Sequence, residues 1–420
     1  MKSEFKTICS NSRYELLIHG GLAYWPDEYD TPNVFIEKSV AMQAEIGDDL
    51  SDALALAWKS LVQHPGTWTI LVREKVSPFR TFFMTDLLGR DQFYFRLDGV
   101  GSDRVEELFG GEIDPVYVGA VAKFGYYVGS RTYAENVFRV QPGNLVTVWP
   151  SGRMELRPLW YKKLDRGNSP EELKSLVTSC FYNDLLDVFS GKRGLTVLVS
   201  GGLDSSIMAH LVMEDIRGGG PLSLLDVEFL TIDNGEDIKY AGLLAEKEGF
   251  DLTVLNPKPE ENLLESALIA ADSPVDLGSL IPNYQLIKAA SHEHILTGDG
   301  PDELFGGYSR IHEYDSQLSD IFMELSFYHL PKLTNTSRYL GKSLICPYLD
   351  PAIISFALST DLYDRTDKSI LKRAFADELP SGIINRDKFA LKSDSVRLDK
   401  IAHRMKCLYL FLDTLKTKKQ

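Results

Sequence analysis

The chemistry of this chain centres on residues 200–206, whose sequence is SGGLDSS. Gly201 and Gly202 can adopt backbone angles that other residues avoid, and they let an anion approach the main chain closely. The hydroxyl donors of the loop are Ser200, Ser205 and Ser206. A helix is expected to begin here, and its first N–H groups and the positive end of its dipole would also face the anion. The loop therefore predicts a cradle for a pyrophosphate-like group.

An acid stands inside this predicted anion cradle. Asp204 would repel a bound pyrophosphate unless a cation lay between the two, so its presence implies Mg²⁺. The alternative is a Ser/Gly loop that only caps a helix. That alternative is disfavoured because residues 195–200, LTVLVS, form an apolar, β-branched strand directly before the loop, which is the strand-loop-helix context that the motif requires.

A second glycine-rich loop, LTGDGPDELFGGY, spans residues 296–308. It follows a predicted strand at 294–298, and ligands of open α/β sheets bind at the carboxyl ends of strands. Its acids are Asp299, Asp302 and Glu303. A surface turn without function would compete as an explanation if this loop stood alone. Together with residues 200–206, it favours a metal-nucleotide site.

A third segment, Gly341-Lys342-Ser343, matches the end of a Walker phosphate loop. The match is incomplete, because Thr336 occupies the position of the first glycine and no strand is predicted before it. We interpret this tripeptide as a solvated turn.

The elements that must position these loops alternate between strand and helix. Strands are predicted at 195–200, 227–232, 252–255 and 294–298. Helices are predicted from about Asp204, and at 237–248, 261–271 and 283–291. This alternation indicates βαβ units and a parallel sheet with helices on both faces. Beyond Tyr308 the pattern is mostly helical.

The first part of the chain has a different pattern. Residues 14–160 are rich in aromatic and β-branched residues broken by turn signals, which is typical of strands, with one helix predicted at 49–63. Ser169 and Pro170 then form an N-cap and first helical position for a helix that we expect to reach about Phe189. We therefore predict two domains, residues 1–165 and 166–420.

Composition narrows the class of protein. The 420 residues carry a net charge of -15, which argues against non-specific nucleic-acid binding. No apolar run is long enough to cross a membrane, and the N-terminus lacks a signal-peptide core, so we expect a cytoplasmic protein without membrane contact. The four cysteines are scattered, which suggests neither a zinc site nor a disulfide framework.

The two loops together resemble the asparagine synthetase family, which includes β-lactam synthetases and lasso-peptide cyclases. Segments 237–250, 345–354 and 368–391 are also similar to family motifs, and the last of these, KSILKRAFADELPSGIINRDKFAL, resembles the closing lysine motif. In the first half, TDLLGRDQFYF and YAENVFRVQPGNLVTV resemble the glutaminase domain. The resemblance implies an α/β protein. Its N-terminal part would be a remnant of a glutaminase-like (Ntn-type) αββα sandwich, and its C-terminal part an adenine-nucleotide α-hydrolase-like domain.

The resemblance also implies a reaction and its residues. In the family, a carboxylate attacks the α-phosphate of ATP, pyrophosphate leaves, and an amine then displaces AMP to give an amide. Carried over, residues 200–206 would hold the pyrophosphate, and Asp204 and Asp302 would bind Mg²⁺. Lys388 would stabilise phosphate charge, and Asp299 would accept the proton of the amine. The expected lining of the adenosine pocket is Val199, Ile232 and Gly298.

The sequence departs from the family at two places. Glutamine-dependent members use an N-terminal cysteine, whereas this chain reads Met1-Lys2-Ser3 and its nearest cysteine, Cys9, is expected to be structural. We therefore expect no glutamine hydrolysis. Ile345 also stands where asparagine synthetases usually carry an arginine, which weakens aspartate as the substrate.

Three functions remain open at this point. The first is an ATP-dependent amide ligase acting on a small-molecule or peptide carboxylate, with ammonia or an amine as nucleophile. The second is an intramolecular ligase of the β-lactam synthetase or macrolactam cyclase type. The third is a catalytically silent nucleotide-binding scaffold. The tRNA-modifying pyrophosphatases share the first loop but fit poorly with the acidic charge. The oligomeric state stays open, with a homodimer among the options.

Overall fold

The parallel sheet of the C-terminal part positions the two loops. The computed structural model describes residues 6–22, 32–46, 49–64, 66–159, 169–191, 193–233, 235–257, 262–307, 323–386 and 400–418. Within these residues the sheet has five parallel strands in the order β12-β11-β10-β13-β14. The strands are β10 (Leu195–Leu198), β11 (Val227–Ile232), β12 (Leu252–Leu255), β13 (His294–Leu296) and β14 (Ser343–Ile345). The predicted parallel α/β architecture is confirmed.

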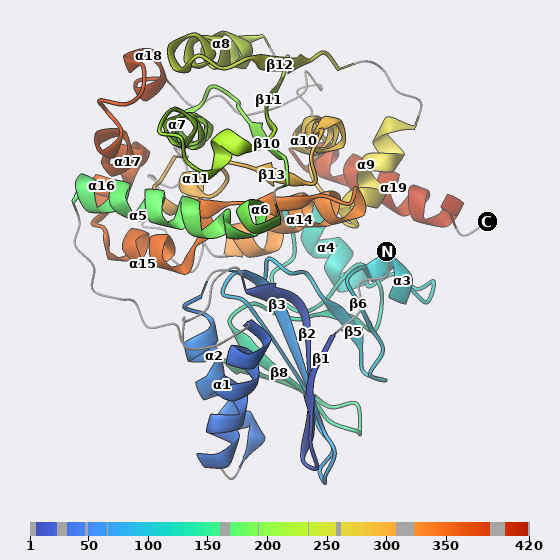
Figure 1. The fold of residues 1–420 in the computed structure, drawn as a ribbon. Coiled ribbons are helices and arrows are strands. Elements are labelled where there is room, and N and C mark those ends of the chain that lie inside the picture. Colours follow the sequence, from blue (N-terminus) through green and yellow to red (C-terminus); the bar gives the residue numbers. More distant parts are fainter. Residues whose placement is uncertain are drawn as a thin grey trace.

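Helices cover both faces of this sheet (Figure 1). They are α7 (Leu203–Arg217), α8 (Glu236–Glu248), α9 (Leu263–Ala271), α10 (Leu277–Ala289) and, beneath α7, α5 (Pro170–Asp184) and α6 (Leu186–Gly191). The Ser169 side chain accepts a hydrogen bond from Glu172 N at 3.1 Å, so the predicted N-cap is confirmed. The helix predicted to reach Phe189 is instead divided at Leu185. Helix α10 begins six residues before the predicted 283 and continues through Pro282.

The last part of the chain is mostly helical, as predicted. Its elements are α11 (Pro301–Leu304), the π-helical turn η2 (Leu325–His329), α14 (Leu330–Tyr339), η3 (Pro347–Leu349), α15 (Pro351–Ser359), α16 (Leu362–Arg365), η4 (Thr366–Lys368), α17 (Ser369–Ala374), α18 (Ser381–Ile384) and α19 (Lys400–Lys418). Strand β14 is the exception, and it adds a fifth strand beside β13. Gly341 turns the chain into this strand with φ 69°. Lys342 donates to the main-chain oxygens of Ala290 and His292.

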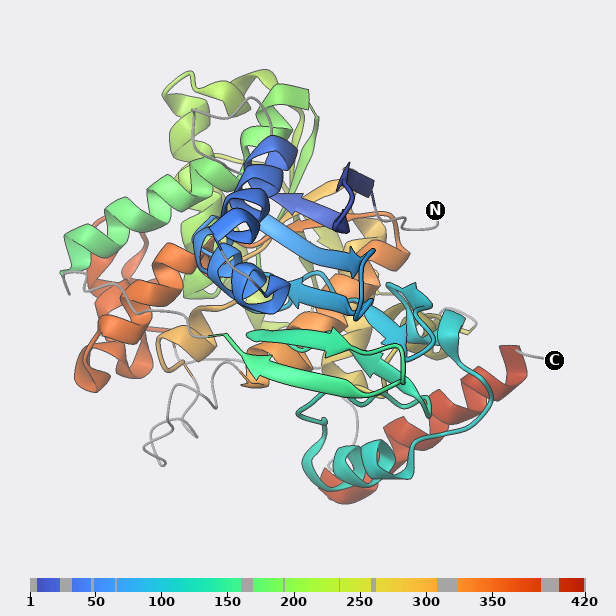
Figure 2. The same cartoon turned by 90° about the horizontal axis from the view of Figure 1, so that it is seen from below.

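The N-terminal part is built on antiparallel sheets. Six strands follow the order β1-β2-β3-β4-β8-β9, and three more form the sheet β6-β5-β7. Their bounds are β1 (Lys6–Ser10), β2 (Tyr14–Leu22), β3 (Gly66–Glu74), β4 (Thr81–Thr85), β5 (Tyr94–Arg96), β6 (Gly101–Ser102), β7 (Val137–Arg139), β8 (Asn144–Val148) and β9 (Met154–Pro158). Helices α1 (Pro32–Ile46) and α2 (Leu50–Leu61) cover one face of the larger sheet (Figure 2). This layering is consistent with the expected Ntn-like architecture.

Two apolar layers hold the N-terminal part together. The fully buried Trp58 and Trp68 lie in the core between the large sheet and its helices. A second core lies between the two sheets, where Phe83 and Phe95 stack with ring centroids 4.6 Å apart. Residues that alternate between these two cores bury both faces of the central strands β3 and β4, whereas the edge strands β1 and β9 are largely exposed.

Polar contacts join the N-terminal part to the C-terminal part. Arg338 of α14 donates to Asp91 Oδ1 at 2.7 Å and to Gln92 O at 3.1 Å. Tyr133 donates to Asp272 Oδ1 at 2.8 Å. Helix α19 lies beside α4 (Pro115–Phe124), where Arg404 donates to Lys123 O at 2.6 Å (Figure 2). The predicted domain boundary at 165/166 lies outside the described residues. No helix among the described residues is long and apolar enough to span a membrane.

Truncating Phe95 to alanine tests the core between the two N-terminal sheets. Phe95 is fully buried, so Phe95→Ala removes its stacking partner and leaves a cavity. We expect the free energy of unfolding to fall by about 3–5 kcal/mol. Leu224→Ala is the control, since that side chain is 85% exposed and its loss should change stability by less than about 0.5 kcal/mol. Equal effects of the two changes in denaturant titrations would contradict this core.

Candidate functional site

The loop at residues 200–206 leaves strand β10 through a backbone turn that requires glycine. Gly201 has φ 69°, a left-handed conformation. A Cβ atom on Gly201 would lie 2.5 Å from Ala241 N and 2.7 Å from Tyr240 Cβ. The loop therefore packs directly against the main chain of helix α8, and its position is fixed by contact as well as by backbone angle.

Serine hydroxyls organise the same loop. Ser200 Oγ and Ser205 Oγ lie 3.0 Å apart, and Ser205 Oγ accepts from Ser200 N at 3.1 Å. Ser200 Oγ also accepts from Gly202 N at 3.3 Å. Ser206 is fully buried in the first turn of α7, and its hydroxyl has no hydrogen-bond partner among the described residues. The loop thus places hydroxyl groups at the N-terminus of a 15-residue helix.

Two acids and one lysine meet beside this loop. Lys368 Nζ lies 2.5 Å from Asp204 Oδ2 and 2.6 Å from Asp302 Oδ1. The three side chains are 10%, 15% and 20% exposed, respectively. Burial alone would lower the pKa of Lys368, but its two carboxylate partners outweigh burial and raise that pKa above its usual value. A cation is therefore held between the two acids that the sequence assigned to Mg²⁺.

The backbone that carries Lys368 is strained. Asp367 and Lys368 have φ values of 52° and 56°, so two consecutive non-glycine residues adopt the left-handed conformation. Their N–H groups donate to Gly306 O at 3.1 Å and to Phe305 O at 2.8 Å. These bonds join the lysine segment to the acidic loop of residues 296–308, and they explain how the strain is sustained.

Gly307 makes room for the meeting of Asp302 and Lys368. A Cβ atom on Gly307 would lie 2.1 Å from Asp302 Oδ1 and 2.5 Å from Lys368 Cε. Gly298 likewise leaves room for the loop at residues 200–206, because a Cβ atom added to Gly298 would lie 2.6 Å from Ser205 N. The two predicted loops are therefore brought together through close contacts that only glycine permits.

The other predicted residues lie at the same edge of the sheet. Asp299 follows β13. Burial of the Cys346 thiol is the main reason that the pKa of Cys346 is raised to about 12, and the negative charge of Asp299 is the next cause. Val199 and Ile232 are buried at the carboxyl ends of β10 and β11, but their side chains belong to different hydrophobic clusters. Ile345 is buried on β14.

Two positively charged side chains at the site were not predicted from the sequence. Lys368 is one, and Arg386 is the other. Arg386 donates to Ser200 O at 3.3 Å, pairs with Asp237, and lies 4.3 Å from the ring centre of Tyr240. Both belong to the segment that resembles the family's closing lysine motif, so the motif was the available signal. Lys388, the residue chosen there, lies outside the described residues.

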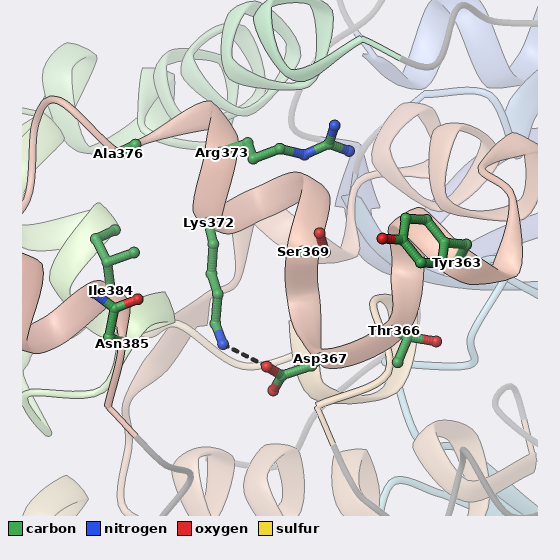
Figure 3. A pocket seen from close by; sticks show the side chains of 9 residues that line it. All are labelled: Tyr363, Thr366, Asp367, Ser369, Lys372, Arg373, Ala376, Ile384 and Asn385. Atoms are coloured by element: carbon green, nitrogen blue, oxygen red, sulfur yellow. Dashed lines mark hydrogen bonds and ion pairs between the residues drawn. The ribbon is translucent and has the colours of Figure 1, made fainter.

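A cavity of about 500 Å³ is lined mainly by residues of α16, η4, α17 and α18 (Figure 3). It is lined by Tyr363, Thr366, Asp367, Ser369, Lys372, Arg373, Ala376, Ile384 and Asn385. In Figure 3 Lys372 reaches Asp367, and the two form a 2.6 Å ion pair. The volume is that of a small-molecule site. A molecule bound there would contact the main chain that holds Lys368 in place.

The residues at the centre fit Mg²⁺ bound together with phosphates. Asp204 and Asp302 supply hard oxygen ligands around a point that Lys368 now occupies with its positive charge. Among the described residues, no group of three or more acids, histidines or cysteines could hold a metal ion alone. Mg²⁺ in phosphate chemistry usually takes one or two carboxylates and completes its shell with phosphate oxygens and water. The donor set therefore suits a metal that arrives with its nucleotide.

Part of the chain is similar to a known family. The sequence model of the asparagine synthase family matches residues 189–345. The glutamine-hydrolysing asparagine synthetase of Brassica oleracea is 26% identical over 285 residues, which cover 59% of this chain and 47% of the relative. That of Gallus gallus is 24% identical over 254 residues, covering 56% and 45%. Glutamine-hydrolysing asparagine synthetase 3 of Arabidopsis thaliana is 23% identical over 316 residues, covering 66% and 54%. The chain spans about half the length of these relatives.

Replacing Lys368 by methionine tests the central ion-pair cluster. Lys368→Met leaves Asp204 and Asp302 facing each other without the lysine cation, and we expect the free energy of unfolding to fall by about 3–5 kcal/mol. Added Mg²⁺ should restore part of the loss, because it can take the place of the ammonium group. Thermal and denaturant unfolding with and without Mg²⁺ measure both effects.

Lys372→Met provides the matched control from the next helical turn. Its partner Asp367 is 71% exposed, so removal of this pair should cost less than about 1 kcal/mol and should not respond to Mg²⁺. Indistinguishable losses in the two variants would show that the buried cluster has no special energetic role.

Proposed function

We propose that the chain is an ATP-dependent ligase that joins a carboxylate to an amine through an acyl-adenylate, because residues 189–345 match the sequence model of the asparagine synthase family. The observation that carries the proposal is the centre formed by Asp204, Asp302 and Lys368 beside a serine-rich loop. A cluster of two acids and a cation at the N-terminus of a helix suits the binding and release of pyrophosphate.

In the first half-reaction, an oxygen of the substrate carboxylate attacks the α-phosphorus of ATP. The bond from that phosphorus to the bridging oxygen breaks, and pyrophosphate leaves. The main-chain N–H groups and hydroxyls of residues 200–206 would hold the departing β- and γ-phosphates. Lys368 would leave its present acid partners to balance the growing phosphate charge, and Mg²⁺, held by Asp204 and Asp302, would neutralise the remainder.

In the second half-reaction, the amine attacks the acyl carbon and AMP leaves. The amine must lose a proton, and Asp299 is the proposed acceptor. Its carboxylate lies close enough to Cys346 and to the buried Lys332 to affect the pKa values of both. Lys388 would act on the phosphates in both steps, as the resemblance implies, although it lies outside the described residues.

The acid that is activated need not be aspartate. Ile345 is 8% exposed and packs into the main core of the synthetase part. It therefore offers an apolar side chain at the position where asparagine synthetases usually carry an arginine. The absence of that arginine is consistent with a bulkier acid. It is also consistent with an acid and an amine within one molecule, as in β-lactam synthetases and macrolactam cyclases.

Carboxylate-dependent exchange of labelled pyrophosphate into ATP tests the proposed first half-reaction. We test a panel of acids that includes aspartate and expect one of them to support exchange. That acid is then identified as the substrate. Asp204→Asn and Lys368→Met should each reduce the exchange rate by at least about 100-fold, because each removes an interaction with the phosphates. Arg153→Met, at an exposed arginine that pairs with Glu155 in the N-terminal part, should exchange at nearly the parental rate.

Silence with every acid would count against a ligase. If ATP still bound, and bound more weakly to Asp204→Asn, the chain would be better described as a nucleotide-binding scaffold. Exchange that survived both Asp204→Asn and Lys368→Met would place the chemistry elsewhere in the protein.

We also propose that the nucleophile does not come from glutamine hydrolysis. Cys9 lies on strand β1, and burial, followed by the charge of Glu37, raises the pKa of its thiol, which opposes thiolate formation. Purified protein given glutamine should release no glutamate above the rate of a Cys9→Ala variant. Release of glutamate that Cys9→Ala abolishes would refute this part of the proposal.

A further inference from the structure

A small cavity lies where the N-terminal and C-terminal parts meet, and its lining includes the exposed Arg131. Its volume is about 40 Å³. The lining residues from the N-terminal part are Tyr94, Val105, Tyr117, Tyr127, Gly129, Arg131, Thr132, Tyr133 and Arg139. Those from the C-terminal part are Asp272, Ser273, Phe327 and Pro331. The cavity thus has an arginine-and-tyrosine wall on one side and the start of helix α14 on the other. It is separate from the centre around Lys368.

Arg139 is the unusual residue of this cavity. It is 7% exposed, it donates to Ser326 O, and its guanidinium lies 4.6 Å from the ring centre of Phe327. Among the described residues, no carboxylate lies within ion-pair distance of Arg139. Burial lowers the pKa of Arg139 to about 10, so the side chain keeps its charge at neutral pH.

Two acids, one lining the cavity and one paired with a lining arginine, have other partners. Asp272 accepts from Tyr133 OH at 2.8 Å and from Val105 N at 2.6 Å. Asp114, which lies behind Arg131, pairs with that arginine at 2.6 Å. A buried cation without a counter-charge costs several kcal/mol, and proteins normally pair it. Among the described residues, the carboxylate that acts on Arg139 is that of the buried Asp86, which lies beyond ion-pair distance of Arg139 and pairs with Arg90.

A second donor faces the same space. The hydroxyl of Tyr94 accepts a hydrogen bond from Asn335 Nδ2 at 3.4 Å, and within the described parts of the chain its own proton has no acceptor. Tyr117 OH lies 3.4 Å from Ser273 Oγ on the opposite lining. The lining therefore places two hydrogen-bond donors toward the cavity, the buried guanidinium of Arg139 and the hydroxyl of Tyr94, which suit an anion. The lining also includes the carboxylate of Asp272, which already accepts two hydrogen bonds.

We propose that this cavity binds a small oxyanion, a carboxylate or a group of similar size such as bicarbonate or nitrate, between Arg139 and Tyr94. The volume exceeds the roughly 10–15 Å³ that one water molecule needs, and it is far below the roughly 300 Å³ of a nucleotide-sized site. Because both parts of the chain line the cavity, the bound anion stabilises their contact. The site stands independently of the ligase chemistry.

Thermal unfolding in the absence of nucleotide tests the site. The full chain is titrated with formate at constant ionic strength, with the balance supplied by a bulky organic anion that the cavity cannot admit. We expect the unfolding midpoint to rise and to saturate. Nitrate and bicarbonate should act in the same way, whereas sulfate should give only a gradual rise without saturation.

Two variants and a control decide the assignment. Arg139→Met should abolish the saturable rise, and Tyr94→Phe, which keeps the packing of the ring, should weaken formate binding by about tenfold. Arg157→Met, at an exposed arginine paired with Asp52, should respond as the parent does. If Arg139→Met fails to fold, Tyr94→Phe alone decides the question.

Two further results of these titrations would support or overturn the oxyanion site. A saturable rise with longer monocarboxylates but not with formate would support the oxyanion site and identify its ligand as the acid group of a larger molecule. A midpoint that rises without saturation in all anions, or that saturates equally in Tyr94→Phe and Arg139→Met, would overturn the proposal and leave a cavity that holds only water.

Discussion

The contact of Lys368 with Asp204 and Asp302 is the interaction on which the site depends. Three charged side chains that are mostly buried must be kept within hydrogen-bond distance, and none can leave without exposing the others to an unbalanced charge. This requirement explains the features around it: the left-handed backbone at Asp367 and Lys368, and the absence of a side chain at Gly307. The strain is concentrated where phosphate chemistry is proposed.

The same cluster explains how the proposed pyrophosphate site can be stable before its ligands bind. Asp204 lies at the N-terminus of helix α7, in a loop that otherwise attracts anions, and without a cation it would repel a phosphate. The lysine supplies that cation in the free protein. In the proposed reaction, Asp204 and Asp302 would hold the metal when it binds with the nucleotide, and Lys368 would be free to move toward the phosphates. One side chain thereby stabilises the free protein and, in the proposed reaction, the departing pyrophosphate.

Much of the fold could be predicted from the sequence, because its signals are local. Strands 227–232 and 252–255 agree to the residue, since each is an apolar run bounded by polar residues. Strand β14 was missed because three residues carry too little pattern, and its identity as a strand comes from pairing with β13. Lys368 was missed for a related reason. Nothing local distinguishes it from Lys372, and only the tertiary structure brings it to two acids on distant loops.

The account predicts that metal binding and nucleotide binding are coupled through Asp204, Asp302 and Lys368. Electron paramagnetic resonance of Mn²⁺ added with a non-hydrolysable ATP analogue measures this coupling directly. We predict one bound Mn²⁺ with hyperfine coupling to phosphorus, much weaker Mn²⁺ binding without the analogue, and loss of the bound signal in Asp302→Asn. Mn²⁺ that binds equally well without the analogue, or a phosphorus-coupled signal that persists in Asp302→Asn, would contradict the account.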